Sequence, residues 1–352
     1  MQKDKRCFGA GLLLLVATAA LQVAARHITG FPTWYAHHVY PVLVGVIGRF
    51  FGIFPFSVVE IGIYLLLFYC IVYVARFWRK PWQLASRGVL LVGALLFAYT
   101  CNCGINYYAV SFSEYAGIGS DGYTKEDLVE LCEYLVGQVN ETATGESYGK
   151  KGGEGGKNSR IWREEATRAM EAASREWPGL GGFYPKPKEV SVSWILSVQQ
   201  LCGIYSPFTI EANFNGDMPD YNIPHTLCHE LSHLKGFMRE DEANFIGYLA
   251  CVGSKRQAFR YSGYLTGWVY AGNALAQADP ERYWALSQRL CDQAKEDLQE
   301  NNAFWGKYEG KVAKAANQVN DAYLKMNDQK DGVRSYGRMV DLMLGYFRDK
   351  LP

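Results

Sequence analysis

Three histidines lie close together in the segment 224–233, which has the sequence PHTLCHELSH. His229 and His233 are four residues apart, so on a helix they lie on the same face and can bind one metal ion together. Glu230 follows the first of them directly, and its carboxylate can reach a metal-bound water without binding the metal. This HExxH arrangement is typical of zinc peptidases. We therefore expect a Zn²⁺ ion at the two histidines, with Glu230 as the general base.

A catalytic zinc ion needs a third protein ligand and keeps a fourth position for water. The segment 239–244, REDEAN, follows shortly after His233. On a helix, Glu240 and Asn244 share one face, so we expect Glu240 to bind the metal and Asn244 to hydrogen-bond a ligand histidine. Glu242 faces elsewhere on the same helix and is the alternative ligand.

Other polar residues near the motif are further candidates. His225 lies one turn before His229, but Pro224 beside it indicates a helix start, where an ordinary polar residue is the simpler interpretation. A tetrahedral oxyanion also needs a hydrogen-bond donor. The sequence does not choose among the four tyrosines that are candidates for this donor, which are Tyr261, Tyr264, Tyr323 and Tyr336.

The elements that hold these residues are mostly helical. From about residue 109 onward, apolar residues recur at helical spacing, and Thr124 with Asp127 forms a capping box. The segment 144–159 is glycine-rich and charged, so we expect a mobile surface loop without chemistry there. Helices are predicted at 127–139, 159–177, 223–234, 241–252 and 257–278, from Asp279, at 303–326 and from Ser335.

Two short β-like runs precede the HExxH motif. Residues 190–196 alternate at first like a strand, and residues 204–214 form a second run that Pro207 restricts to a sheet edge. An exposed edge strand can bind a peptide through main-chain hydrogen bonds. Three polar residues alternate onto one face of this run and are candidate substrate contacts, although a loop with ordinary polar residues explains them equally well: Glu211, Asn213 and Asn215.

The N-terminal third is both apolar and basic. Three runs have the length and composition of bilayer-spanning helices, at about 7–25, 57–75 and 88–108. The basic loop 76–87 and the basic N-terminus mark the cytoplasmic side. This orientation places a domain of residues 109–352 outside the cytoplasm. A cleavable secretory signal peptide is the alternative interpretation of the first run, because it has a basic start, an apolar core and a small-residue end.

Charge and cysteine content exclude other classes of protein. The chain has 352 residues and a formal net charge of +1, with nine Lys and Arg against two acids in residues 1–107, leaving 27 basic and 33 acidic residues in 108–352. A mildly acidic domain argues against a nucleic-acid partner, which requires a concentrated basic face. The nine cysteines lack paired CxxC spacing, and an odd number cannot form a closed disulfide framework.

Two resemblances sharpen these expectations. HELSH followed by EDEAN resembles the gluzincin metallopeptidases, in which two histidines and a downstream glutamate hold zinc, and this implies Glu240 as that glutamate. More narrowly, the chain resembles the bacterial membrane family of the domain of unknown function 3810 over nearly its whole length. That resemblance implies three N-terminal spans and an extracytoplasmic zincin domain, and it rests on residues 102–109, 203–215, 223–230, 240–245, 260–265 and 331–337.

The sequence thus predicts a mainly α protein, with three transmembrane helices in residues 1–108 and a zincin-like α+β domain with a small edge β-sheet. We expect a multi-pass protein of the bacterial cell membrane. The expected function is a zinc-dependent metallopeptidase that hydrolyses an extracytoplasmic protein or peptide, with the lipid bilayer as its other partner. Charged residues on both sides of the HExxH motif argue against an intramembrane protease.

Two other functions remain open from the sequence. The first is a zinc-containing membrane sensor or binding protein with a zincin-like domain and no turnover. The second is a purely structural zinc site, although Glu230 would be unnecessary there. Loss of turnover on replacing Glu230, with zinc retained, would distinguish the peptidase from both.

Overall fold

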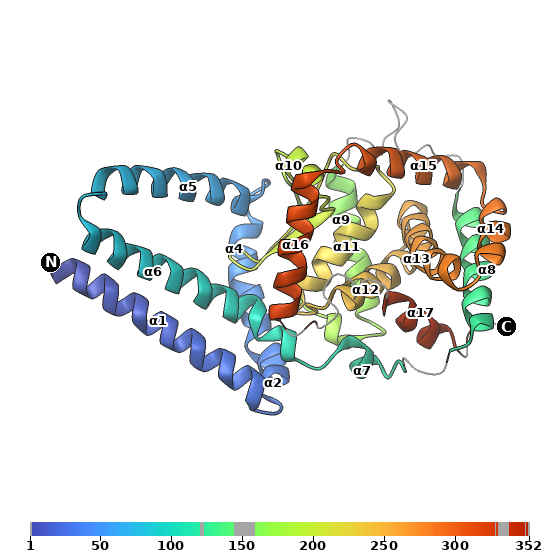
Figure 1. The fold of residues 1–352 in the computed structure, drawn as a ribbon. Coiled ribbons are helices and arrows are strands. Elements are labelled where there is room, and N and C mark those ends of the chain that lie inside the picture. The colour runs from blue at the N-terminus through green and yellow to red at the C-terminus, as the bar shows by residue number, and fades with distance from the viewer. Residues whose placement is uncertain are drawn as a thin grey trace. The chain divides into compact units, whose positions relative to one another are not determined.

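The computed structural model describes residues 2–119, 123–143, 159–327, 329, 338–348 and 350 (Figure 1). The described chain is mainly helical and contains one three-stranded sheet. It divides into two compact units, the first of Met1–Val110 with Ser206–Glu211 and the second of Ser111–Tyr205 with Ala212–Pro352. Residues 144–158 of the expected surface loop, and residues 331–337 of the family resemblance, lie outside the described residues.

Three helices of the first unit are long and apolar enough to cross a membrane. They are α1 (Gln2–His27), α5 (Val58–Phe77) and α6 (Pro81–Tyr99), the last continuing through η2 (Thr100–Gly104) and η3 (Asn106–Tyr108). The three predicted apolar runs lie within these helices or overlap their ends. Between α1 and α5 the chain forms α2 (Phe31–His38), α3 (Tyr40–Leu43), η1 (Val44–Gly48) and α4 (Arg49–Gly52).

Helices α1 and α6 lie side by side (Figure 1). A Cβ added to Gly11 would lie 2.6 Å from the backbone nitrogen of Leu90, and one added to Gly93 would lie 2.7 Å from the carbonyl oxygen of Gly11. Glycine is therefore required at both positions for the backbones to approach this closely. Such small-residue contacts are a main source of helix association in lipid, where burying apolar side chains gives no hydrophobic gain.

The short segment Ser206–Glu211 belongs to the first unit through hydrogen bonds to its helices. The Glu211 carboxylate accepts the backbone N–H groups of Val58 at 3.2 Å and Val59 at 2.9 Å, at the N-terminus of α5. Asn102 donates from Nδ2 to the carbonyl oxygen of Pro207 at 2.7 Å. A carboxylate at a helix N-terminus is favourable because the first N–H groups have no helical partner.

The second unit is built mainly from helices. Its longest described helices are α8 (Lys125–Thr142), α9 (Ser159–Ala173), α13 (Gln257–Ala278), α15 (Asp292–Gly306) and α16 (Lys311–Met326). The shorter ones are α7 (Phe112–Ala116), η4 (Pro178–Leu180), α10 (Trp194–Val198), α11 (Asn222–Leu234), α12 (Glu240–Val252), α14 (Pro280–Gln288) and α17 (Met339–Phe347). The predicted capping box at Thr124 is present, with Asp127 as its partner.

Some predicted boundaries were wrong. The helix expected at 303–326 is two helices, because α15 ends at Gly306 and α16 begins after Gly310. The helix expected at 159–177 ends at Ala173. The run 190–196 is not a strand: its second half is the start of α10, and the Ser193 hydroxyl donates to the carbonyl oxygen of Val190 in a turn.

The sheet consists of β1 (Lys188–Glu189), β2 (Gly203–Ser206) and β3 (Glu211–Phe214), in the order β1-β3-β2. β1 runs parallel to β3, with Lys188 opposite Asn213. The predicted run 204–214 is therefore two strands. A turn separates them, in which Ile210 has a positive φ of 49° and Pro207 lies outside either strand. β2 is an edge strand of this sheet.

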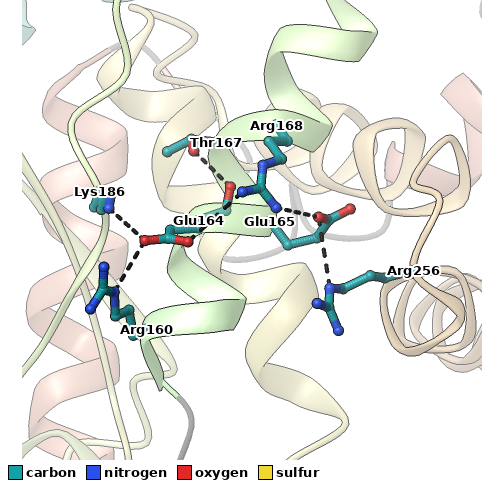
Figure 2. A network of polar contacts seen from close by, with 7 residues as sticks. All are labelled: Arg160, Glu164, Glu165, Thr167, Arg168, Lys186 and Arg256. Atoms are coloured by element: carbon teal, nitrogen blue, oxygen red, sulfur yellow. Dashed lines mark hydrogen bonds and ion pairs between the residues drawn. The ribbon is translucent and has the colours of Figure 1, made fainter.

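An ion-pair network fixes α9 to the turn after α12 (Figure 2). The buried Glu165 carboxylate accepts the Ser254 hydroxyl at 2.7 Å and pairs with Arg168 at 3.5 Å and Arg256 at 3.8 Å. Glu164, one residue earlier, pairs with Arg160, Arg168 and Lys186 on the surface. The buried carboxylate has both charged and hydroxyl partners, which a buried charge requires.

Candidate metal centre

His229, His233 and Glu240 come together on two consecutive helices, α11 and α12. Nε2 of His229 and Nε2 of His233 are 3.1 Å apart. Glu240 places Oε2 3.4 Å from the first and Oε1 3.7 Å from the second. A tetrahedral zinc ion with ligand bonds of about 2.0–2.2 Å needs ligand atoms about 3.3 Å apart. Two imidazole nitrogens and a carboxylate oxygen at these separations fit zinc and leave one position open.

A tight turn brings α12 back beside α11. Gly236 adopts a φ of +99°, which only glycine adopts without strain. The backbone N–H of Phe237 then bonds the carbonyl oxygen of Ser232 at 3.2 Å and ends α11. The Phe237 carbonyl oxygen in turn accepts a hydrogen bond from Nδ1 of His233 at 2.9 Å. Because a carbonyl only accepts, Nδ1 carries a proton, and Nε2 is the ring nitrogen that faces Nε2 of His229.

The charges of the three candidate ligands are coupled. Burial lowers the pKa of His233, but the Glu240 carboxylate outweighs it and the pKa rises to about 9. Burial raises the pKa of Glu240, but the two histidines outweigh it and hold that pKa well below its usual range. The Glu240 carboxylate is thus ionised at neutral pH. It lies beside Nε2 of both histidines, so one cation could bind all three side chains.

Glu230 lies beside this cluster without joining it. Its side chain is buried, and Oε1 is 4.0 Å from Nε2 of His229. Burial raises the pKa of Glu230 to about 7, although the histidines and a hydrogen bond from the Tyr205 backbone pull it down. A buried carboxylate poised near neutrality is what a general base requires.

Edge strand β2 passes directly beside the Glu230 carboxylate. A Cβ added to Gly203 would lie 2.5 Å from Oε1 of Glu230 and 2.8 Å from the carbonyl oxygen of Asn213. Any other residue at this position would therefore displace either the carboxylate or the strand. Further along the strand, the Ile204 side chain is 46% exposed. β2 is thus exposed at Ile204 and lies beside the buried Glu230 carboxylate at Gly203.

The side chain of Glu242, the alternative ligand, is used elsewhere. Its carboxylate accepts the backbone N–H of Phe112 at 2.9 Å and pairs with Arg239 at 3.5 Å. Burial raises the pKa of Glu242 to about 7. The geometry therefore favours Glu240 as the third ligand.

The expected role of Asn244 is not seen. Nδ2 of Asn244 and Nδ1 of His229 are both buried without a hydrogen-bond partner. The backbone carbonyl oxygen of Asn244 accepts a hydrogen bond from Nε2 of His225 at 3.0 Å. His225 lies in the first turn of α11, as the sequence indicates, and it is buried; burial lowers its pKa to about 3, so it is neutral.

The three residues proposed as substrate contacts have internal partners. Glu211 binds the N-terminus of α5, as described above. Asn213 donates from Nδ2 to the Ile204 carbonyl oxygen at 3.3 Å. Asn215 donates to the Leu201 carbonyl oxygen at 3.1 Å and accepts the N–H of Asp217 at 2.9 Å. All three are buried. Strand alternation could not show this, because both faces of β3 are covered.

A tyrosine near the metal cluster was missed in the sequence. Burial, and then the charges of Cys202 and Glu240, raise the pKa of Tyr270 on α13. No short motif marks this residue, because packing of α13 brings it near α12. Among the four tyrosines named earlier, Tyr261 donates to Asp297 at 2.5 Å and Tyr264 pairs with Tyr134. Tyr323 lies on α16, and Tyr336 is outside the described residues.

Fold and site together describe a mainly helical protein with three candidate membrane spans and a His-His-Glu cluster. The chain belongs to the family described as "Protein of unknown function (DUF3810)", whose model matches residues 35–344. The match covers most of the chain and leaves α1 outside it. Neither the curated proteins nor the solved structures contain a match to this chain.

Proposed function

We propose that this protein is a membrane-anchored zinc-dependent metallopeptidase with a gluzincin-like site. The observation that carries the proposal is the convergence of His229, His233 and Glu240 at metal-binding distances, with Glu230 beside them and outside the ligand set. A structural zinc site has no need of a buried carboxylate at this place. The second unit would then be a zincin-like domain.

The division of labour follows from this arrangement. The two histidines and Glu240 would hold the metal. When bound, zinc supplies a Lewis acid for the substrate carbonyl and lowers the pKa of the attacking water. Glu230 would accept a proton from the water that attacks the peptide bond and deliver it to the leaving amine. Tyr270 is the candidate donor to the developing oxyanion.

The substrate would bind as an extended peptide along β2. Edge strands offer main-chain donors and acceptors to an added strand, which gives affinity without demanding a particular sequence. Because Gly203 brings β2 against Glu230, a peptide paired with this strand passes close to the base and the metal ligands. The proposed substrate class is therefore an unfolded segment of a protein, or a peptide.

We place the peptidase domain outside the cytoplasm of a bacterial cell, in a multi-pass membrane protein. The basic residues between α5 and α6 favour the cytoplasm for that loop. A membrane-impermeant thiol reagent should label an Arg175→Cys variant in intact cells more strongly than the parent protein. Labelling that requires cell lysis would reverse the orientation.

The central experiment compares Glu230→Gln with the parent protein, both purified as full chains in detergent. The amide keeps the shape of the side chain, so zinc content should stay at one ion per chain. The amide cannot accept the proton, so turnover should be lost. In a second measurement, on cells that express each protein, peptide release should fall by about 10²- to 10⁴-fold in the variant, the usual contribution of a general base. Glu130, which is exposed on α8, gives the matched control: Glu130→Gln should keep both the zinc content and the peptide release of the parent. Equal peptide release by Glu230→Gln and parent would refute the peptidase and favour a sensor.

A further inference from the structure

A cavity lies in the second unit, at the opposite end of α12 from the metal cluster. Its volume is about 410 Å³, within the usual range for small-molecule sites. Residues of α8, α9, α12, α13 and α17 line it, and none of the metal-cluster residues does. Glu240 and Tyr248 are separated by two turns of α12, or about 12 Å.

The cavity has the electrostatics of a cation site. Both α9 and α12 end at it, through residues 169–173 and 249–253. Helix C-termini carry a partial negative charge that stabilises a nearby cation. Glu176 adds a full carboxylate at the rim, while no Lys, Arg or His appears among the described residues of the lining. Of the cations near the lining along the chain, Arg168 and Arg256 are already paired with Glu165 (Figure 2).

The walls are aromatic. The lining includes the rings of Tyr134, Trp177, Tyr248, Tyr264, Tyr346 and Phe347, over a floor of alanines. Ring faces attract an ammonium group within about 6 Å, and most strongly when water is excluded. The Tyr346 ring already attracts an ammonium group of this chain, since Nζ of Lys350 lies 3.4 Å from its centroid.

One wall group also lacks a partner. The Tyr248 side chain is fully buried, and its hydroxyl has no hydrogen-bond partner. Leaving such a group unpaired is unfavourable, because the hydroxyl has lost its bonds to water without replacing them. A polar substituent on a bound ligand would satisfy it.

We propose that this cavity binds a small substituted ammonium ion whose alkyl groups contact the aromatic walls and whose polar substituent pairs with Tyr248. The two helix ends and Glu176 balance the positive charge. The site is independent of the metal centre, because the two share no residue.

The test uses choline as the probe and full-length protein in phosphatidylglycerol nanodiscs, which contain no choline lipid. Calorimetric titration should show one binding event. The carbon isostere of choline, with a tert-butyl group in place of trimethylammonium, should bind about tenfold more weakly or worse, because it lacks the charge. Equal affinity for the two probes, or no choline binding, would overturn the proposal.

Variants then locate the site. Glu176→Gln should weaken choline binding by at least about threefold, while Glu171→Gln, which is exposed on α9 outside the lining, should not. Tyr248→Phe should weaken it by about threefold and leave the melting temperature unchanged or higher, since the lost hydroxyl had no partner. His229→Ala should bind choline like the parent, whatever its peptidase activity. Unchanged affinity in both Glu176→Gln and Tyr248→Phe, or lost affinity in His229→Ala, would place the binding elsewhere and refute the assignment.

Discussion

Replacing Gly203 by alanine tests the contact between β2 and Glu230 directly. The added Cβ would lie 2.5 Å from Oε1 and 2.7 Å from Cγ of Glu230. Ordinary van der Waals contact begins near 3.4 Å, so the carboxylate or the strand must move by about 0.9 Å, the difference between the two distances. The Asn213 carbonyl oxygen, 2.8 Å away, blocks the route toward β3. The Glu230 side chain must therefore move.

The size of the effect follows from that displacement. A misplacement of about 1 Å at a reacting group can cost about 10²-fold in rate. Overpacking a well-filled site costs about 1–3 kcal/mol of stability. We expect Gly203→Ala to lose about 10²-fold in peptide release, to melt at a lower temperature and to keep its zinc, since no ligand atom is displaced.

The assay measures peptide release, zinc content and thermal unfolding on the same full-length preparations. Gly137→Ala on α8 is the matched control, because a Cβ at that position meets nothing within 4 Å. It should be as active as the parent and slightly more stable, by about 0.5–1 kcal/mol, as expected for glycine replaced within a helix. If Gly203→Ala instead matches Gly137→Ala in both activity and melting temperature, β2 does not contact Glu230. The proposal that peptides bind along β2 is then wrong.

Three further predictions concern the same unit. His229→Ala and His233→Ala should abolish zinc binding measured by elemental analysis, and Glu240→Ala should weaken it more than Glu242→Ala does; the reverse ranking would make Glu242 the ligand. Tyr270→Phe should keep zinc but lower turnover by about 10²- to 10³-fold if its hydroxyl stabilises the oxyanion, and full turnover would dismiss that role. Burial raises the pKa of Asp297 from 3.8 to about 6. The folded state therefore binds this proton more tightly than the unfolded state, and the free energy of unfolding should fall as pH rises from about 4 to 6. In Asp297→Asn that part of the slope, followed by thermal melts, should disappear; an unchanged slope would show that other groups cause it.

Features with a local cause were predictable from the sequence. The three apolar helices depend only on runs of apolar residues long enough to cross a bilayer. The capping box at Thr124 and the i, i+4 placement of His229 and His233 are likewise set by residues about one helical turn apart. The HExxH motif thus lies within a single helix, as its spacing predicts, and its zinc chemistry stays a prediction. Where the pattern was ambiguous, as in residues 190–196, a local turn at Ser193 prevailed over alternation.

The tertiary structure decided which groups meet across elements. Glu240 and Glu242 lie on one turn of α12, and packing against α7 directs Glu242 to the N–H of Phe112 while Glu240 faces the histidines. Similarly, only packing shows that Asn215 is an internal support and that Tyr270 lies near Glu240. A sequence records the spacing of residues along one element. The direction in which a buried polar side chain finds its partner depends on a second element far away in the chain, and that information exists only after the helices have packed.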